Sequence, residues 1–390
     1  MNNELKLRYG CNPNQIPARA YSRAERLPFT VLNGSVGYIN LLDALNSWQL
    51  VHELNAVTGD VAAASFKHVS PSGVSLGLPL SEPLRKACGV EDLELSPVGS
   101  AYARARGTDR LCSFGDWVAI SDTVDVSLAR LLQREVSDGI VAPGYEPEAL
   151  AILSKKKQGK YIILAMDKDY VAPEQETRDV FGVALEQRRN DVRLDAAVLS
   201  TIVTKNMDWP AAARRDALVA LATLKYTQSN SVCVVVDGQT IGVGAGQQSR
   251  IHCTRIACSK AETWHLRQYP ACLDLKFKSE VGRPDRDNAV DQYLRDDLTA
   301  AELRLLTELF SVAPPVLSRE QKRHWLTGLR GAVLGSDGYI PFRDSIDRAY
   351  QSGVAFVVQP GSSKRDDEVI QACNEYGVAM AHTGIRLFHH

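Results

Sequence analysis

Lys67 and His68 stand side by side in the stretch Phe66-Lys67-His68-Val69-Ser70 and are the first candidates for chemistry in this sequence. The apolar run 61–66 before them predicts a short buried strand, and Ser-Pro-Ser-Gly at 70–73 predicts a chain-breaking turn. Open α/β sheets bind ligands at the carboxyl ends of such strands. A neighbouring ammonium disfavours protonation of an imidazole, so His68 can act as a base. For this pair alone, a solvated lysine beside a capping histidine is the competing interpretation.

Three further groups of residues have the types that bind anions. Arg8 precedes Tyr9, and such a pair can grip an anion and stack on a ring, although a surface pair is the alternative. The glycine-rich segment 242–246 lies between a predicted strand and a predicted helix, with Arg250 in the first turn of that helix. It is not a dinucleotide fingerprint, and plain turn chemistry explains it equally well. Arg386 follows an apolar strand, in a C-terminal tail that is either frayed or ordered.

The composition limits the classes of function. The 390 residues suggest two domains, and 45% hydrophobic residues suffice for large cores. The 45 basic and 46 acidic residues nearly cancel, which disfavours a general nucleic-acid-binding role. Eight dispersed cysteines without Cys-x-x-Cys spacing are typical of reduced thiols in a cytoplasmic protein and predict no metal site. With no secretory signal and no membrane-spanning run, we expect no membrane partner.

Helices and short apolar strands alternate along the chain, which predicts an α/β fold. Residues 167–195 are charged and weakly periodic, and we expect them to link two halves. We therefore predict one domain at 1–190, which carries the Lys-His pair, and a second at 191–390. Within the second, residues of about 260–330 are predicted to form a helical excursion from the sheet. A similarity between residues 67–74 and 225–232 suggests an internal duplication, over only eight positions.

Several motifs dispersed along the chain occur together in one family. They are Arg8-Tyr9-Gly10 with Asn12-Pro13, Phe66-Lys67-His68-Val69-Ser70-Pro71, Ser113-Phe114-Gly115-Asp116, Val136-Ser137-Asp138-Gly139, Lys225-Tyr226-Thr227-Gln228-Ser229-Asn230-Ser231-Val232, Gly244-Ala245-Gly246-Gln247-Gln248-Ser249-Arg250, Asn288-Ala289-Val290-Asp291-Gln292-Tyr293, Pro341-Phe342-Arg343-Asp344 and Arg386-Leu387-Phe388-His389-His390. With these motifs in order, the sequence closely resembles the AICAR transformylase domain of the bifunctional purine biosynthesis proteins, and most closely its animal-type form. The resemblance covers essentially the whole chain.

The resemblance implies a fold and a reaction. It implies two cytidine-deaminase-like α/β/α subdomains and a homodimer with both active sites at the interface. The implied reaction transfers a formyl group from 10-formyltetrahydrofolate, a cosubstrate, to the 5-amino group of aminoimidazole carboxamide ribonucleotide (AICAR). This is the penultimate step in making inosine monophosphate. No tightly bound cofactor is implied, and whether a potassium ion binds is left open.

The resemblance also assigns roles to residues. His68 matches the family's base, Lys67 matches the residue that stabilises the oxyanion or protonates the folate nitrogen, and Asn230 matches a residue that orients the reacting groups. The residues that match the AICAR-binding set are Arg8, Tyr9, Gly115, Asp138, Arg250, Arg386 and Phe388. The residues that match the folate-binding set are Leu111, Phe114, Ile251, Tyr339, Pro341, Asp344 and Ser363. Arginines suit a phosphate, and an apolar slot with one carboxylate suits a pterin.

The sequence departs from the family pattern in two respects. The cyclohydrolase domain that precedes the transformylase in the bifunctional protein is missing from this sequence, so we expect no cyclohydrolase activity from it. Tyr339 and Leu111 stand where Phe and Met are frequent, which concerns the affinity for folate rather than the reaction.

Two other functions compete with the transformylase. A zinc deaminase would share the implied fold, but it needs His-x-Glu with Pro-Cys-x-x-Cys, and neither combination occurs. A catalytically silent nucleotide-binding module predicts loss of the Lys-His pair or of the asparagine, whereas all three residues are present. We therefore expect a formyltransferase.

Overall fold

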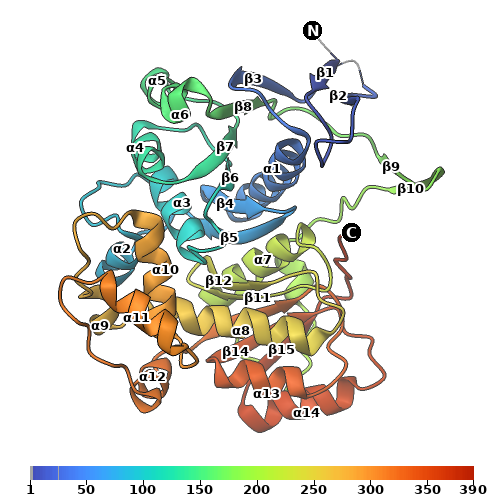
Figure 1. The fold of residues 1–390 in the computed structure, drawn as a ribbon. Coiled ribbons are helices and arrows are strands. Elements are labelled where there is room, and N and C mark those ends of the chain that lie inside the picture. The colour runs from blue at the N-terminus through green and yellow to red at the C-terminus, as the bar shows by residue number, and fades with distance from the viewer. Residues whose placement is uncertain (1–2, 25) are drawn as a thin grey trace.

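An eleven-stranded sheet runs through the molecule, with helices packed against both of its faces (Figure 1). The computed structural model describes residues 3–24 and 26–390. The order of strands in the sheet is β15-β14-β13-β11-β12-β5-β4-β6-β7-β8-β3. Two small sheets, β1–β2 and β9–β10, are separate from it. The expected α/β class is confirmed.

The strands, in chain order, are β1 (Glu4–Leu7), β2 (Ala18–Tyr21), β3 (Phe29–Asn33), β4 (Ala62–Lys67), β5 (Ser70–Leu76), β6 (Asp116–Ile120), β7 (Ser137–Ala142), β8 (Ile162–Met166), β9 (Gln175–Val180), β10 (Val183–Arg188), β11 (Val232–Val236), β12 (Gln239–Gly244), β13 (Ala332–Ser336), β14 (Val354–Gln359) and β15 (Ala379–His382). The helices are α1 (Tyr38–Thr58), α2 (Glu82–Cys88), α3 (Pro97–Gly107), α4 (Val126–Arg134), α5 (Pro147–Ser154), α6 (Lys156–Gly159), η1 (Ala196–Leu199), α7 (Ala211–Lys225), α8 (Arg250–Leu266), α9 (Pro270–Leu273), α10 (Arg283–Leu294), α11 (Ala300–Glu308), α12 (Arg319–Leu326), α13 (Asp344–Gln351) and α14 (Asp366–Tyr376).

The two halves of the sheet repeat one strand order. In the first half β5, β4, β6, β7 and β8 lie side by side, and in the second half β12, β11, β13, β14 and β15 lie in the same order. In each half the second strand runs antiparallel to both of its neighbours, and the last three strands are parallel. The halves join where β5 pairs antiparallel with β12 through Ser75 and Gln239. This repeat supports an internal duplication, while the boundary between residues 190 and 191 stays a prediction.

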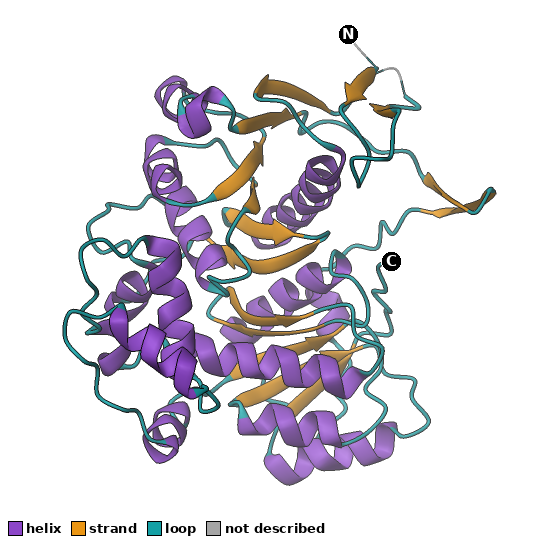
Figure 2. Cartoon of the chain, in the orientation of Figure 1, coloured by secondary structure: helices purple, strands orange, loops and turns teal. Residues whose placement is uncertain are grey.

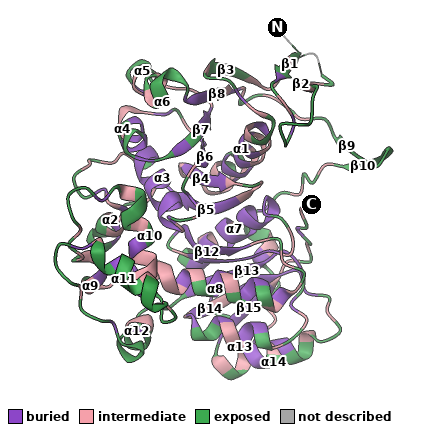
Figure 3. Ribbon diagram, in the orientation of Figure 1, coloured by how far each residue is buried: buried purple, intermediate pink, exposed green. Residues whose placement is uncertain are grey.

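Side chains alternate along the strands and enter cores on both faces of the sheet. In β4, Ala62, Ala64 and Phe66 join the core that contains α1 and α7, whereas Ala63 joins the core that contains α3. The first core extends across both halves of the sheet. On the opposite face, α3, α4 and α5 cover the first half, and α8, α13 and α14 cover the second. The strands at the centre are therefore buried almost throughout (Figure 3).

Two glycines allow helices to approach the central strands closely. A Cβ atom on Gly73 of β5 would lie 2.0 Å from the carbonyl oxygen of Ala105 in α3. A Cβ atom on Gly242 of β12 would lie 2.0 Å from the carbonyl oxygen of Ala257 in α8. Only glycine leaves room for backbone contacts this close. These positions therefore set the distance of α3 and α8 from the sheet.

The predicted turn at residues 70–73 is wrong. Ser70–Leu76 form β5, and His68 and Val69 alone make the turn that joins it to β4. Gly73 serves the close approach of α3 rather than a turn. Pro71 is tolerated in the strand because β5 pairs with β12 only at Ser75, so no ladder partner on that side requires its missing N–H.

The eight-residue similarity does not follow the topological repeat. Lys67 ends a strand, whereas Lys225 ends α7 and forms a buried ion pair with Glu53 at 2.8 Å. The two segments therefore occupy different places in the two halves. The duplication is visible in the order of the strands, and the similarity that suggested it has no structural counterpart.

The helical excursion and the linking segment lie outside the repeated core. α9–α12 form the helical excursion predicted at about 260–330, and side chains of α9, α10 and α12 pack with the end of α8. The predicted link 167–195 contains the β9–β10 hairpin, which projects from the body and is exposed along nearly its whole length (Figures 1 and 3). Figure 2 shows its two strands apart from those of the central sheet. In the described ranges no helix has the length and apolar character that crossing a membrane would need.

We expect Gly242→Ala to destabilise the protein, because its methyl group would overlap the backbone of Ala257 and displace α8 from the sheet. Overpacking of this kind costs about 1–3 kcal/mol or more of unfolding free energy. Thermal unfolding followed by circular dichroism measures the loss. Gly282→Ala is the matched control, because its nearest neighbouring atom is 3.7 Å from the added carbon. Equal losses in the two variants would contradict this explanation.

Candidate active site

Strand ends from the first half of the sheet meet at one edge. Lys67 at the end of β4 pairs with Ser70 at the start of β5, and Phe66 lies opposite Trp117 near the start of β6. β7 and β8 run parallel to β6, so their starts lie at the same edge. The parallel strands of the first half therefore contribute their amino ends.

The second half of the sheet meets the same edge with the opposite strand ends. Because β5 and β12 are antiparallel, the start of β5 lies on the same side as the end of β12. Val232 at the start of β11 lies opposite Gly244 at the end of β12 and Ser336 at the end of β13. β14 and β15 run parallel to β13 and also end there. We call this row of strand ends, from β8 to β15, the site edge.

The predicted catalytic residues fall on the site edge, but Lys67 reaches it for a different reason than expected. β4 is antiparallel to both β5 and β6, so the rule for the carboxyl ends of parallel strands does not apply to it. In the second half that rule does hold, since β13, β14 and β15 end at the site edge. Asn230 lies there as well, two residues before β11.

The β4–β5 turn presents His68 to solvent. His68 and Val69 both have left-handed backbone angles, with φ of 55° and 58°. The imidazole is exposed, and Lys67 is half-buried. The Lys67 Nζ donates a hydrogen bond to the carbonyl oxygen of Phe114 at 2.7 Å. The ammonium is therefore held against the segment before β6 while the imidazole stays accessible.

Asp43, on the buried face of α1, supports this turn. Its Oδ1 accepts a hydrogen bond from the Val69 N–H at 2.7 Å, and the residue is only 6% exposed. Burial raises the pKa of Asp43 to about 6, although the Val69 N–H and the charge of His68 act to lower it. Sequence reasoning missed Asp43. The available signal was an acidic residue between Leu42 and Ala44 in an apolar helical pattern.

The segments that begin β6 and β7 carry three predicted residues to the site edge. Phe114 is 46% exposed beside Lys67. Gly115 has a φ of 73°, and its N–H donates to the carbonyl oxygen of Val136 at 2.9 Å. Asp138 is exposed in β7 and forms an ion pair with Lys157 at 2.7 Å. The left-handed angle at Gly115 explains why glycine suits that position.

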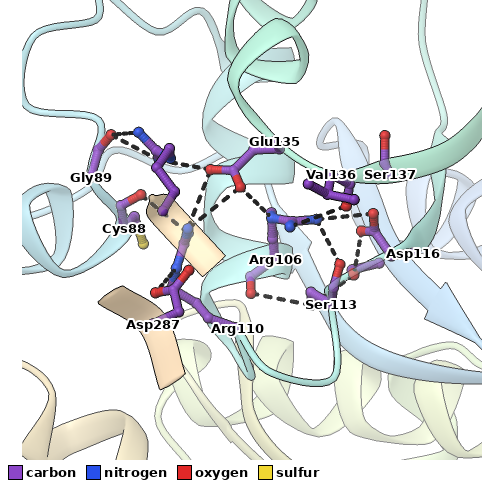
Figure 4. Close-up of polar contacts among 12 residues, drawn as sticks. Cys88, Gly89, Arg106, Arg110, Ser113, Asp116, Glu135, Val136, Ser137 and Asp287 are labelled. Carbon is purple, nitrogen blue, oxygen red and sulfur yellow. Dashed lines mark hydrogen bonds and ion pairs between the residues drawn. The ribbon is translucent and has the colours of Figure 1, made fainter. Parts of the chain in front are cut away.

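A buried network of charges holds these segments in place (Figure 4). Arg106 of α3 pairs with Asp116 at 2.9 Å and with Glu135 at 3.0 Å. It also donates to the carbonyl oxygen of Ser113 at 2.7 Å. One guanidinium thus connects α3, the start of β6 and the residue that precedes the β7 segment. Sequence reasoning missed this role of Arg106.

The network continues to the helical excursion. Arg110 pairs with Glu135 at 3.3 Å and with Asp287 of α10 at 2.6 Å, and Arg283 pairs with Glu135 at 2.7 Å. Burial alone would raise the pKa of Glu135, but the guanidinium groups of Arg110, Arg106 and Arg283 lower it to about 2. The carboxylate therefore stays ionised and fixes three arginines around the loop that carries Phe114 and Gly115.

Asn230 is held by a buried arginine. Arg250, in the first turn of α8, donates from Nη2 to the Asn230 Oδ1 at 2.8 Å and pairs through Nη1 with the buried Asp337. Arg250 is 6% exposed and also donates to the carbonyl oxygen of Ser231 at 2.8 Å. It therefore orients the amide of Asn230 and is already paired with a carboxylate. Asp337 was missed because its partner lies 87 residues away in the chain.

The C-terminal tail packs beside Asn230, in agreement with the ordered alternative. The Leu387 N–H donates to the carbonyl oxygen of Asp337 at 2.8 Å. Ser229 and His389 exchange two hydrogen bonds of 3.0 Å. The Arg386 guanidinium lies 4.7 Å from the centroid of the Phe388 ring, and both side chains are exposed. The tail thus places an exposed cation and an aromatic ring near the site edge.

The residues that match the folate-binding set lie in two groups. Leu111 and Phe114 precede β6 and line a cavity of about 320 Å³ together with parts of the charge network. The second group lies after β13 and β14 and at the starts of α8 and α13: Ile251, Tyr339, Pro341, Asp344 and Ser363. Between the two groups, no hydrogen bond or ion pair is found in the part of the chain that the structure describes. Within the described residues of one chain, the two groups of residues are therefore not linked by direct polar contacts.

Arg8 and Tyr9 lie after β1, outside the large sheet. The Arg8 guanidinium is 5.8 Å from the centroid of the Tyr9 ring, and Arg8 is exposed. Within residues 3–24 and 26–390, neither side chain forms a hydrogen bond or ion pair with the site edge. Over the same ranges, no group of three or more His, Cys, Asp or Glu residues is arranged to hold a metal ion.

Comparison with known proteins points to one family. A family model described as AICARFT/IMPCHase bienzyme matches residues 1–260. The bifunctional purine biosynthesis protein PurH of Xylella fastidiosa (strain M12) is 30% identical over 393 residues, which cover 99% of this chain and 58% of that protein. The protein of the same name from Cereibacter sphaeroides (strain ATCC 17029 / ATH 2.4.9) is 30% identical over 389 residues, which cover 98% and 59%. The chain spans about three fifths of the length of these curated relatives.

We expect Asp43→Asn to raise the free energy of unfolding at pH 7. The folded-state pKa of about 6 lies above the ordinary value of 3.8, so ionisation of Asp43 reduces stability as the pH rises between these values. Two pKa units correspond to roughly 2–3 kcal/mol. Asparagine removes the charge and keeps an acceptor for the Val69 N–H.

Urea unfolding of both proteins from about pH 4 to about pH 7 measures this difference. The gain of the variant over the wild type should be largest at pH 7 and should disappear near the acid end of the series. A difference in stability that does not change with pH would contradict the buried ionisation of Asp43.

Proposed function

The chain belongs to the AICARFT/IMPCHase bienzyme family, and on that basis we propose that it transfers a formyl group from 10-formyltetrahydrofolate to the 5-amino group of AICAR. The products are formyl-AICAR and tetrahydrofolate, and the reaction belongs to purine biosynthesis. One observation carries the proposal: Lys67, His68 and Asn230, from opposite halves of the chain, fall on one edge of the sheet. The relatives named bifunctional purine biosynthesis protein support it.

The proposed chemistry needs a base and a group that stabilises negative charge. The amine of AICAR is a weak nucleophile because its lone pair delocalises through the imidazole toward the carboxamide. Its attack forms a bond to the formyl carbon and builds an oxyanion and an ammonium. His68 removes a proton from that nitrogen, the bond between the formyl carbon and the folate N10 breaks, and N10 takes up a proton. A positioned base and an electrostatic stabiliser can each lower the barrier by several kcal/mol.

Lys67 and Asn230 take the two remaining catalytic roles in this proposal. The Lys67 ammonium, held 2.7 Å from the Phe114 carbonyl oxygen, stabilises the oxyanion or supplies the proton to N10. The Asn230 amide orients the reacting groups, and its contact with Arg250 fixes its direction. Both assignments are supported by the immobilisation of these side chains at the site edge.

For AICAR we propose the residues that match the family's nucleotide set: Arg8, Tyr9, Gly115, Asp138, Arg250, Arg386 and Phe388. Arg386 is an exposed cation suited to a phosphate, and Asp138 suits a sugar hydroxyl or a ring N–H. Arg250 acts in this proposal through Asn230, because its guanidinium is already paired with Asp337. For the folate we propose Leu111, Phe114, Ile251, Tyr339, Pro341, Asp344 and Ser363. The resemblance to the animal-type form and a cytoplasmic location stay predictions, and whether a potassium ion binds stays open.

We expect His68→Ala to lower kcat by about 10²- to 10⁴-fold, because the amine would lose its base. Affinity for AICAR, measured by isothermal titration calorimetry, should stay close to that of the wild type. Formation of tetrahydrofolate, followed by its absorbance, reports the rate. His324→Ala, an exposed histidine in α12, is the control and should be fully active.

An unchanged rate in the His68→Ala variant would rule out His68 as the base. If the wild-type protein binds AICAR but transfers no formyl group when both substrates are supplied, the silent nucleotide-binding module becomes the better function.

We also propose that the active protein is a homodimer with its sites at the interface. In a single chain several residues of the proposed folate and AICAR sites are exposed apolar side chains, among them Phe114, Tyr339 and Phe388. The two folate groups have no direct polar connection in one chain. A second copy that covers the site edge would bury these side chains and could complete the site, as the self-complementary interface of a two-fold dimer allows.

The β9–β10 hairpin supports a second copy at this place. Its strand pairing puts Val180, Val183 and Leu185 together on one face near the tip, where Arg178 lies opposite Leu185, and Asp179 and Ala184 on the other face. All of these residues are exposed, as is Phe181 at the tip. An isolated two-stranded ribbon is marginally stable in water, so exposed apolar side chains grouped near its tip favour a partner.

The hairpin starts beside the site edge. Arg23 donates to the Thr177 hydroxyl of β9 at 2.8 Å, and this contact holds the polar face of the ribbon. Burial lowers the pKa of His389, and the charges of Glu176 and Arg178 also act on it, which places the base of the hairpin near the C-terminal tail. From there it projects away from its own body (Figure 1). In this proposal its apolar residues contact a second subunit at the same edge.

Leu185→Asp should weaken the dimer and lower activity in parallel, because it puts a charge on the apolar face of the hairpin. Ala184→Asp is the matched control, since the neighbouring residue points to the polar face. Analytical ultracentrifugation and the formyl-transfer assay at a series of protein concentrations measure the two effects. A fully active monomer, or a Leu185→Asp variant with unchanged association, would contradict the proposed interface.

A further inference from the structure

The turn that carries His68 is conformationally strained. Its two residues have φ of 55° and 58°, and neither is glycine. A left-handed angle is costly for most residues and is a genuine outlier for a β-branched one such as Val69. Two-residue hairpin turns of this kind favour Asn-Gly, not His-Val. Such a conformation persists only where surrounding groups enforce it.

Asp43 is the group that reaches this turn from the core. It sits on α1, which packs against the sheet through Leu41, Trp48 and Leu54, so its backbone is firmly placed. Its Oδ1 lies 2.7 Å from the Val69 nitrogen. The charged groups that act on it are His68 in the turn and Asp138 in β7. Within the described residues Asp43 has no salt-bridge partner, so its carboxylate is committed to the backbone of the turn.

We propose that Asp43 is a positioning residue, which holds the His68–Val69 turn in its left-handed conformation and thereby fixes the direction of the His68 imidazole. This proposal rests on the proposed function, because it assumes that His68 is the base. Asp43 touches neither substrate and acts through the Val69 N–H.

A buried carboxylate at position 43 reduces stability, and we infer that its benefit is to fix the position of the His68–Val69 turn. Burying an unpaired carboxylate is costly, and a single hydrogen bond repays little of that cost. An apolar side chain at this position of α1 would pack in the same core without the cost of burying a charge. The carboxylate instead gives one end of the strained turn a rigid acceptor, while the Lys67 contact with Phe114 holds the other end. The backbone of His68 lies between these two fixed points, which sets the direction of the Cα–Cβ bond that carries the imidazole.

The test compares Asp43→Ala with Asp43→Asn. Alanine removes the acceptor, and we expect kcat to fall about 10- to 100-fold because small displacements of a catalytic group have effects of this size. The KM for AICAR should change little, since Asp43 is buried and its carboxylate bonds to the backbone of the turn. Asparagine retains an oxygen acceptor, so kcat should stay within about threefold of the wild type. Ser47→Ala is the control and should keep full activity, because this buried hydroxyl donates to the Ala44 carbonyl oxygen of the same helix.

A second variant separates positioning from general loss of stability. Val69→Gly makes the left-handed angle inexpensive, so it should restore much of the kcat lost in Asp43→Ala when the two are combined. A merely destabilising substitution would not be rescued in this way. Hydrogen-exchange mass spectrometry on peptides that cover residues 66–72 should show faster exchange in Asp43→Ala and near-normal exchange in Asp43→Asn.

The outcomes distinguish this proposal from the proposed function. If the wild type transfers no formyl group, the function fails, and the exchange measurement still tests the hold on the turn. If the wild type is active and Asp43→Ala is equally active, the positioning role is overturned. It is also overturned if Asp43→Asn loses as much activity as Asp43→Ala, or if Val69→Gly brings no recovery.

Discussion

The antiparallel pairing of β5 with β12 is the interaction on which the rest of the structure depends. Each half of the chain builds a hairpin whose outer strand would otherwise leave a row of unpaired backbone groups. Ser75 and Gln239 pair across the junction, and the Val74 N–H donates to the Thr240 hydroxyl at 2.8 Å. Because the two strands are antiparallel, the amino ends of the parallel strands in one half and their carboxyl ends in the other reach the same edge. The site edge is a direct consequence of that geometry.

Buried charges then hold the functional segments at this edge. In the first half, Arg106 and Glu135 fix the loops before β6 and β7, and in the second half Arg250 and Asp337 fix Asn230. Such pairs contribute little net stability, because desolvation offsets their attraction, but removing one partner leaves an uncompensated charge. In this structure the pairs act mainly by fixing the positions of the loops and of the Asn230 side chain. Asp43 belongs with them as a buried carboxylate whose contact is with backbone rather than with a cation.

Much of the fold and part of the site could be predicted from local sequence. The alternation of helices and strands gave the α/β class, the apolar run before Lys67 located β4, and the motifs around His68 and Asn230 marked the residues that we propose to be catalytic. The turn was misplaced because Gly73 looks like a turn residue and is present for contact with α3. Arg250 was predicted as a ligand for an anion because its position in the first turn of a helix says nothing of its pairing with Asp337. In both cases the residue in contact, Ala105 for Gly73 and Asp337 for Arg250, is distant in sequence.

The sequence by itself determined which side chains can do chemistry, where the helices and strands lie, and which family the motifs resemble, because residue type, periodicity and short spacings act over a few residues. Only the tertiary structure decided that strand ends from both halves share one edge, that His68 and Val69 form a strained turn held by Asp43, and that the linking segment forms a projecting hairpin. These features depend on contacts between segments far apart in the chain. Backbone pairing and helix-to-sheet packing choose among such contacts, and no local pattern of residues records that choice.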